Sequence, residues 1–418
     1  MTGLLTGFFR SDAIDAIWSD DALIDAFIDV ERIWIEAAVA CGQADARAPG
    51  MFDERATDLR ANWRSLGDEI ADVGRPIAPL VARLCTDAPL ELQRVVHLGL
   101  STQDVVDAAR ARCRRASMDR IARDLAKPVH DLIALADDHA ATLMVARTNG
   151  QDAAPITLGL VLTDIAADIS RTANAAVERC DAAMTFMLAG PIGLSSPFGA
   201  ASDQVRREAA VRLGGRHEPT AHPIPPGQFA VADALSSVPL FTGAMARLAR
   251  FVQSRCQSGV ADMAEDGSGA SSSLPHKRNP RRVERIIAIH DAACTHPAPM
   301  LRALAQSDLR NGEALMSLWR VDSELLTLAH SAVRETTALI EGLSIFPDRM
   351  ADAIAAATPA IYSDRRLTEQ SRDVGRTAAL AETKRPADHQ TAPSPRQIDR
   401  WRREIIETCQ LRQRGLAV

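Results

Sequence analysis

The chain is poor in features that mark several classes of protein. Its 418 residues include one tyrosine and three lysines, and its seven cysteines are scattered without a CxxC pair. An odd, scattered set of cysteines argues against a disulfide framework and fits small apolar residues in a reducing cytoplasm. No apolar run approaches the roughly 20 residues that span a bilayer, and the N-terminus lacks the basic start of a secretory signal. We therefore expect a cytoplasmic protein without a membrane segment.

Charge and the absence of certain motifs exclude further functions. The net charge is −6, so no basic surface indicates nucleic acid as a partner. The sequence has no Walker loop, no GxGxxG fingerprint and no HExxH, and its histidines lack metal-ligand spacing. We expect neither a nucleotide cofactor nor a metal.

Helix-forming residues are abundant. Alanine is frequent, and the shortage of tyrosine disfavours strands. Three helical stretches near or above 30 residues exceed the globular mean of about 11–12, and their broad apolar faces indicate a bundle. Helical periodicity predicts helices over residues 11–45, 52–90, 104–143, 155–186, 228–264, 281–296 and 312–343.

The predicted fold is all-α, in three consecutive parts. Residues 1–103 form a small N-terminal helical domain, 104–345 a central long-helix bundle, and 346–418 a reduced C-terminal helical region with a tail. Pro128 is expected to interrupt or kink its helix. Two segments are expected to be non-helical: a polar loop at 147–155 and a linker or disordered tail at 382–398.

The most informative segment is DGSGASSSLPHKRNP, residues 266–280. An arbitrary Ser/Gly segment between two helices is most simply a flexible connection. This one is pinned at its end by two prolines, and cationic and amide donors follow its serines at Lys277, Arg278 and Asn279. Such donors suit an anionic substrate or an oxyanion.

This segment resembles the pattern G-S-S-x-M-P-x-K-x-N-P of the fumarase/aspartase superfamily, with Ala270 and Leu274 as mild departures. That superfamily includes fumarase, aspartase, argininosuccinate lyase, adenylosuccinate lyase and 3-carboxy-cis,cis-muconate cycloisomerase. The resemblance covers roughly residues 8–345. It implies that Ser271 is the catalytic base and that the site also includes Ser272, Lys277 and Asn279.

The implied mechanism places demands on Ser271. A serine is a poor base, so it needs a desolvated site in which backbone N–H groups and Lys277 stabilise its alkoxide. A mobile loop that closes over the substrate can create that site. Lys277 and Asn279 would then hold the substrate carboxylate on which negative charge builds up.

The segment HLGLSTQD, residues 97–104, resembles the superfamily's H-x-G-x-T-S-x-D. By itself it can be explained as a helix cap at Ser101 or Thr102. Together with the Ser-rich segment, it implies that His97, Ser101 and Thr102 contact a substrate carboxylate. Gln103 is nearest to the carboxymuconate cycloisomerase branch.

The segment RTNGQDAAP, residues 147–155, resembles R-T-H-x-Q-x-A-x-P, and Thr148 and Gln151 match. The superfamily's histidine, which helps to protonate the leaving group in several members, is Asn149 here. Asparagine cannot shuttle protons near neutral pH. Either the leaving group needs no proton, or another residue supplies it, with His97 and His276 as candidates.

Three further segments bear on substrate binding. Arg310 lies where the superfamily has Q-x-H-E-R, and it either binds a carboxylate or pairs with Asp308. The turn at 190–193 is expected to be structural, with an anion cradle as the alternative. Phe8 and Phe9 replace the Arg-Tyr pair that binds a nucleotide phosphate in adenylosuccinate lyase, which argues against adenylosuccinate.

The implied reaction is β-elimination from a succinate-type dicarboxylate or polycarboxylate. It yields fumarate, or a substituted fumarate, and an amine, nitrite or similar leaving group. Cycloisomerisation of carboxymuconate is the alternative, and a non-catalytic helical scaffold is a second one. The resemblance also implies a homotetramer whose active sites draw their segments from three subunits.

Overall fold

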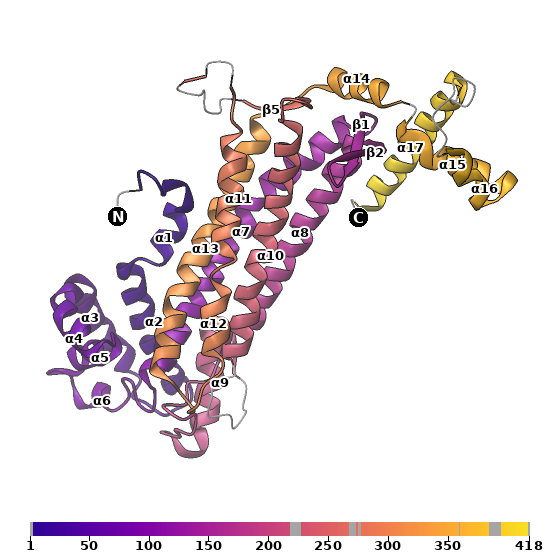
Figure 1. Cartoon of the computed structure of the whole chain (residues 1–418). Helices are drawn as coiled ribbons and strands as arrows, with labels where there is room; N and C mark the ends of the chain where they lie inside the picture. Colours follow the sequence, from indigo (N-terminus) through magenta and orange to yellow (C-terminus); the bar gives the residue numbers. More distant parts are fainter. Residues whose placement is uncertain are drawn as a thin grey trace. The chain divides into compact units, whose positions relative to one another are not determined.

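The computed structural model describes residues 3–217, 227–266, 273–274, 277–358, 360–383 and 394–416. Within these ranges the chain is largely helical, with three two-stranded sheets (Figure 1). Its contacts divide it into two compact units, one formed by residues 1–123, 172–242 and 289–332, the other by 124–171, 243–288 and 333–418. Several long helices contribute residues to both units.

The predicted all-α class is confirmed. The long helices are α7 (Thr102–Asp138), α8 (Leu158–Ala182), α10 (Gly227–Arg255), α11 (Arg281–Ala293) and α13 (Gly312–Glu341). Pro128 lies inside α7 and does not end it. The division at residues 103 and 345 remains a prediction.

The first unit also contains shorter helices, drawn in indigo to purple at the start of the chain (Figure 1). They are η1 (Gly7–Phe9), α1 (Asp12–Ile17), α2 (Asp20–Ala40), α3 (Ala48–Asn62), η2 (Trp63–Leu66), α4 (Gly67–Val73), α5 (Ile77–Cys85) and α6 (Leu90–Gln93). Later in the chain come β3 (Thr185–Phe186), η3 (Gly199–Ala201), α9 (Ser202–Arg212), β4 (Arg216–His217) and α12 (Pro297–Ala303).

The helical segment predicted over residues 11–45 consists of two helices, α1 and α2. The first ends at Ile17, and Ser19 caps the second, because its hydroxyl accepts a hydrogen bond from the N–H of Ala22 at 3.3 Å. A serine before two aspartates is a helix start signal that the apolar periodicity concealed.

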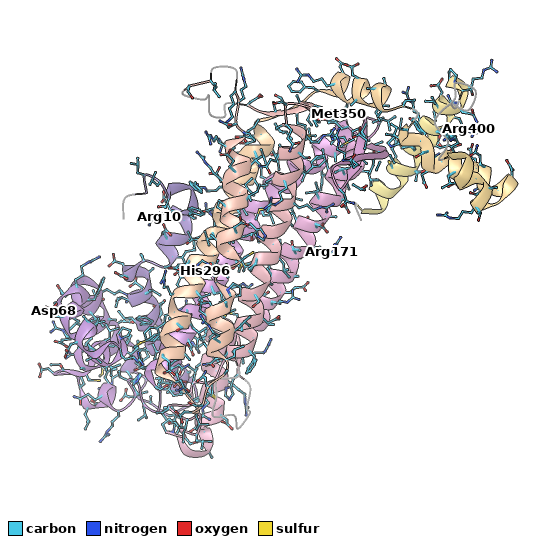
Figure 2. All side chains as sticks on the ribbon, in the orientation of Figure 1. Arg10, Asp68, Arg171, His296, Met350 and Arg400 are labelled. Atoms are coloured by element: carbon cyan, nitrogen blue, oxygen red, sulfur yellow. The ribbon has the colours of Figure 1, made fainter. Side chains whose placement is uncertain are left out.

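Apolar side chains of α2, α3, α5 and α9 form the core of the first unit. Trp34 is 1% exposed there, and its indole N–H donates to the carbonyl of Leu98 at 3.2 Å. Helix α1 is tied to α13 by a 2.7 Å hydrogen bond between Ser11 Oγ and His330 Nδ1. Arg10, labelled in Figure 2, pairs with Asp15 at 2.8 Å.

A charged group is buried between α7 and α13 in the first unit. Asp322 is fully buried, forms an ion pair with Arg110 at 2.9 Å and accepts a hydrogen bond from Arg114 at 3.0 Å. One carboxylate therefore serves two buried guanidinium groups, whose burial is tolerable only because they are paired.

The second unit contains the hairpin of β1 (Leu143–Thr148) and β2 (Gln151–Thr157), and the antiparallel pair of β5 (Met263–Glu265) and β6 (Leu343–Ile345). Its remaining elements are α14 (Pro347–Ala357), η4 (Ala360–Tyr362), α15 (Ser363–Val374), α16 (Arg376–Thr383) and α17 (Pro395–Leu416). The hairpin packs against α14 and α17 around a core in which Tyr362 stacks on Trp401, with ring centroids 5.6 Å apart.

Three predictions in the second unit were wrong. Residues 147–155 are mostly strand rather than loop, because Asn149 and Gly150 form a tight hairpin turn. Helix α10 ends at Arg255, before residue 264, where Arg255 turns back to pair with buried Asp262. The expected tail at 382–398 is helical at its described ends, in α16 and in α17, which Ser394 opens with a capping box to Gln397, and its residues 384–393 lie outside the described part of the chain.

One helix in the described part of the chain, Gln228–Arg255, is long and apolar enough to cross a membrane by length and composition alone. Of its most apolar window, 56% is buried inside the fold. A core helix of a bundle has the same composition, so this helix is weak evidence for a membrane span.

Candidate active site

Helix α7 begins with a capping box in the first unit. The carboxylate of Asp104 accepts from the backbone N–H and the hydroxyl of Ser101, both at 2.7 Å, and Ser101 Oγ accepts from the N–H of Asp104 at 3.3 Å. The cap predicted at Ser101 or Thr102 is therefore confirmed at Ser101. Thr102 is the first residue of the helix and is half-buried.

The glycine turn after residue 189 lies against this helix start. Gly190 donates its N–H to Asp104 at 3.0 Å, so the anion that the turn binds is a side chain of the protein. A Cβ on Gly190 would lie 2.9 Å from the carbonyl oxygen of Gly99, which shows how closely the two backbones approach. Burial raises the pKa of Asp104, although these hydrogen bonds and the charge of Arg310 oppose the shift.

Arg310 reaches the same cap from a distant segment. Its Nη1 donates to Ser101 Oγ at 3.0 Å, while Nε and Nη2 are buried and have no hydrogen-bond partner among the described residues. Asp308 instead uses its backbone N–H to bind the side chain of Asn311 at 3.2 Å. The sequence left two roles open for Arg310, binding a carboxylate or pairing with Asp308. This geometry fits carboxylate binding better.

His97 lies just before the cap in a left-handed conformation, with φ at 53°. Its Nδ1 is 2.6 Å from Glu31 Oε1, and its backbone N–H donates to Glu31 Oε2 at 2.9 Å. Burial acts to lower the pKa of His97, but the hydrogen bond and charge of Glu31 outweigh it and raise this pKa above 6.5. The side chain keeps 21% of its surface exposed, so its ring can reach a substrate.

Sequence reasoning missed Glu31. It lies on the apolar face of α2, four residues after Phe27 and four before Ile35, both of which are buried. An acidic residue on an otherwise apolar helix face is a signal that it has a buried partner.

The second unit carries the segment around Asn149. With φ of 53° at Asn149 and 76° at Gly150, the two residues form the turn between the paired Thr148 and Gln151. All four are exposed at the tip of the hairpin. Asn-Gly between alternating residues is a strong hairpin signal that could have been recognised in the sequence.

The Ser-rich segment starts and ends at anchored points of the second unit. Before it, Asp266 donates its N–H to Gly342 at 2.6 Å and accepts from Ser344 Oγ at 2.7 Å. After it, the Glu265 carboxylate accepts the N–H of Arg282 at 3.1 Å at the start of α11. Both anchors hold the ends of a long connection in place.

Two of the predicted site residues in the Ser-rich segment lie in the described part of the chain. Lys277 is exposed, and its N–H donates to Leu274 at 2.9 Å, while Asn279 is half-buried. The residues that lie outside the described part of the chain are Ser271, Ser272 and His276. The structure thus gathers His97, Ser101, Thr102 and Arg310 in one unit and leaves Thr148, Asn149, Gln151, Lys277 and Asn279 in the other.

Solved structures define the class of this fold. The 3-carboxy-cis,cis-muconate lactonizing enzyme from Pseudomonas putida superposes with a TM-score of 0.83 at 21% identity, covering 100% of both chains. A likeness at this identity shows the fold, which is that of the fumarase/aspartase superfamily.

Sequence comparisons then show the family. A family model described as "Lyase" matches residues 11–293, about two thirds of the chain, so the protein belongs to this lyase family and is an enzyme of the fumarase/aspartase superfamily. It is 26% identical to a 3-carboxy-cis,cis-muconate cycloisomerase from Bradyrhizobium diazoefficiens, over 91% of this chain and 85% of that one. It is 27% identical to a nitrosuccinate lyase from Streptomyces davaonensis, over 94% and 85%. The resemblance identified from the sequence motifs is confirmed.

Proposed function

We propose that this enzyme removes a proton next to a carboxylate of a succinate-type substrate and expels a leaving group, giving fumarate or a substituted fumarate. The observation that carries the proposal is the Arg310–Ser101 hydrogen bond at the start of α7, four residues after His97. This bond brings a cation to a helix N-terminus, and His97 precedes that helix in the same unit.

This arrangement suits a substrate carboxylate. The N-terminal end of α7 carries partial positive charge, and an arginine binds a carboxylate through parallel N–H groups. Arg310 Nε and Nη2 have no acceptor among the described residues, and buried donors without acceptors are unfavourable. A bound carboxylate would satisfy them once the atoms that cover them move aside.

The proton steps follow from the proposed roles. Ser271 takes the proton from carbon, and Lys277 and Asn279 stabilise the charge that develops on the adjacent carboxylate. The electron pair of the broken C–H bond forms the new double bond as the leaving group departs with its own pair. Nitrite leaves as an anion, whereas an amine takes a proton, which His97 can supply.

Cycloisomerisation of a carboxymuconate is the second candidate. The 26% identity to a cycloisomerase over most of both chains favours it, as does Gln103 in the segment after His97. Asn149 at the hairpin tip and the 27% identity to a nitrosuccinate lyase favour elimination without protonation at that position.

We further propose a homotetramer with shared active sites. The exposed tip at residues 148–151 is available to another subunit, and helix α10 exposes Phe229 by 65% and Leu240 by 62%. Side chains of this kind are usually buried, and a subunit interface would bury both. Light scattering on the purified protein should give about 180 kDa, four times the 45.0 kDa chain mass.

The test is an ultraviolet assay for fumarate with nitrosuccinate, aspartate, malate, argininosuccinate and adenylosuccinate, and a separate diene assay with carboxymuconate. Ser271→Ala should lower the rate by about 100-fold or more, as expected for a lost general base. Ser273→Ala, two residues along, is the matched control and should remain active. Activity only in the diene assay would favour the cycloisomerase, and a folded oligomer that is silent with every substrate would favour the non-catalytic scaffold.

A further inference from the structure

We propose that Glu31 is a positioning residue for this reaction: its two carboxylate oxygens hold the ring and the backbone of His97, so that Nε2 is the nitrogen presented to the substrate. The role as proton donor rests on the proposed function. The geometry of the Glu31–His97 pair does not.

The contacts determine which ring nitrogen is free. Glu31 Oε1 lies 2.6 Å from Nδ1, a short distance typical of a charge-assisted hydrogen bond. A carboxylate only accepts, so Nδ1 carries the hydrogen. Nε2 has no partner among the described residues, so it is left to accept a proton or, in the charged ring, to donate one.

The second oxygen of Glu31 holds the backbone. A histidine in the left-handed region is strained, and such a conformation persists only where its surroundings hold it. Glu31 Oε2 accepts the N–H of His97 at 2.9 Å, and Trp34, one turn further along α2, donates to the next carbonyl at Leu98. One helix therefore anchors two successive residues of the segment.

Glu31 is buried, so its carboxylate needs a partner for its charge. The residue is 3% exposed, and among the described residues His97 is its one ion-pair partner. A carboxylate without a lysine or arginine partner is unfavourable in a core. Asp104 is the other charged group that acts on His97, and because it is also acidic, both carboxylates favour the charged imidazole.

The pair offers a proton donor that Asn149 cannot provide. The superfamily's acid histidine is absent there, and a leaving group that needs a proton must obtain it elsewhere. A charged ring with Nδ1 bound to a carboxylate keeps the hydrogen on Nε2 for donation to a leaving group.

The first experiment is NMR of the full-length protein with labelled histidine, comparing the wild type with Glu31→Gln. Glu36→Gln is the matched control, since Glu36 lies on the same helix and pairs instead with Arg32 at 2.6 Å. We expect the neutral His97 ring to carry its hydrogen on Nδ1 and its titration to move to lower pH in Glu31→Gln alone. An unchanged titration in that variant would overturn the proposal.

Kinetics provide the second readout. Glu31→Gln should lower kcat by roughly 10-fold for an amine leaving group, with KM little changed, and much less for nitrite, because only the amine needs a proton. Equal losses for both would show a merely structural role. If Glu31→Gln does not fold, the test is the nitrogen chemical shifts of the His97 ring in the wild type. A neutral ring protonated on Nε2 overturns the proposal. Absence of any activity in the wild type would count against the proposed function and leave the NMR result standing.

Discussion

Arg310 Nη1 donates to Ser101 Oγ at 3.0 Å across 209 residues of sequence. The hydroxyl that caps α7 thereby joins a helix N-terminus to a guanidinium. A local cap and a distant cation meet at the point where we place a substrate carboxylate.

Replacing Arg310 with methionine should weaken binding of the substrate dicarboxylate by about 10- to 100-fold, the range expected for losing a charge-assisted hydrogen bond. Calorimetric titration with fumarate measures this directly. Arg302→Met, at an exposed position of α12, is the control and should bind normally. Equal affinities of both variants would place the carboxylate elsewhere.

Gly99 and Gly42 form a natural pair of test sites, with φ of 74° and 69°. Alanine at Gly42 meets open space, so it should cost about 1–2 kcal/mol for the left-handed backbone alone. At Gly99 the new Cβ would lie 2.6 Å from both Pro197 Cγ and Ser195 Oγ, adding about 1–3 kcal/mol of overpacking. Denaturant unfolding should rank Gly99→Ala as clearly the less stable, and the reverse order would contradict the close approach.

Asp322→Asn should destabilise the protein by about 3–5 kcal/mol, because buried Arg114 would lose its carboxylate partner and Arg110 would keep only its longer pair with Asp107 at 3.7 Å. The control is Asp119→Asn, whose pair with Arg115 is exposed and should contribute at most about 1 kcal/mol. Thermal and urea unfolding of the two variants would measure the difference. Similar stabilities would mean that the buried pair is compensated elsewhere.

The Glu31–His97 pair should make stability depend on pH. The pKa of His97 is raised above 6.5 in the folded state, so its stabilising contribution is fully present below pH 6.5 and is lost as pH rises through the folded pKa. The difference in unfolding free energy between wild type and Glu31→Gln should therefore shrink as pH increases. Urea unfolding at pH values on both sides of 6.5 tests this, and a difference that grows with pH would contradict the sign.

The helical architecture could be predicted because its signals are local. Apolar residues at helical spacing indicated α7, α8, α10, α11 and α13, with errors mainly at their ends. Two errors had local causes as well: the Asn149–Gly150 turn and the capping box at Ser394 were both readable in the sequence. In each case the prediction followed the polar composition of the whole segment and overlooked a short motif within it.

The sequence by itself determined the family and indicated the residues to which we propose to assign the chemistry, because motifs such as SSSLPHKRNP record residue types at close spacing. It also placed the cap at the start of α7. Only the tertiary structure decided which partners meet: Glu31 with His97 across 66 residues, and Ser101 with Arg310 across 209. Hydrogen bonds of this kind depend on how helices pack and turn against one another, and periodicity shows which face of a helix is buried but not which side chain it meets there.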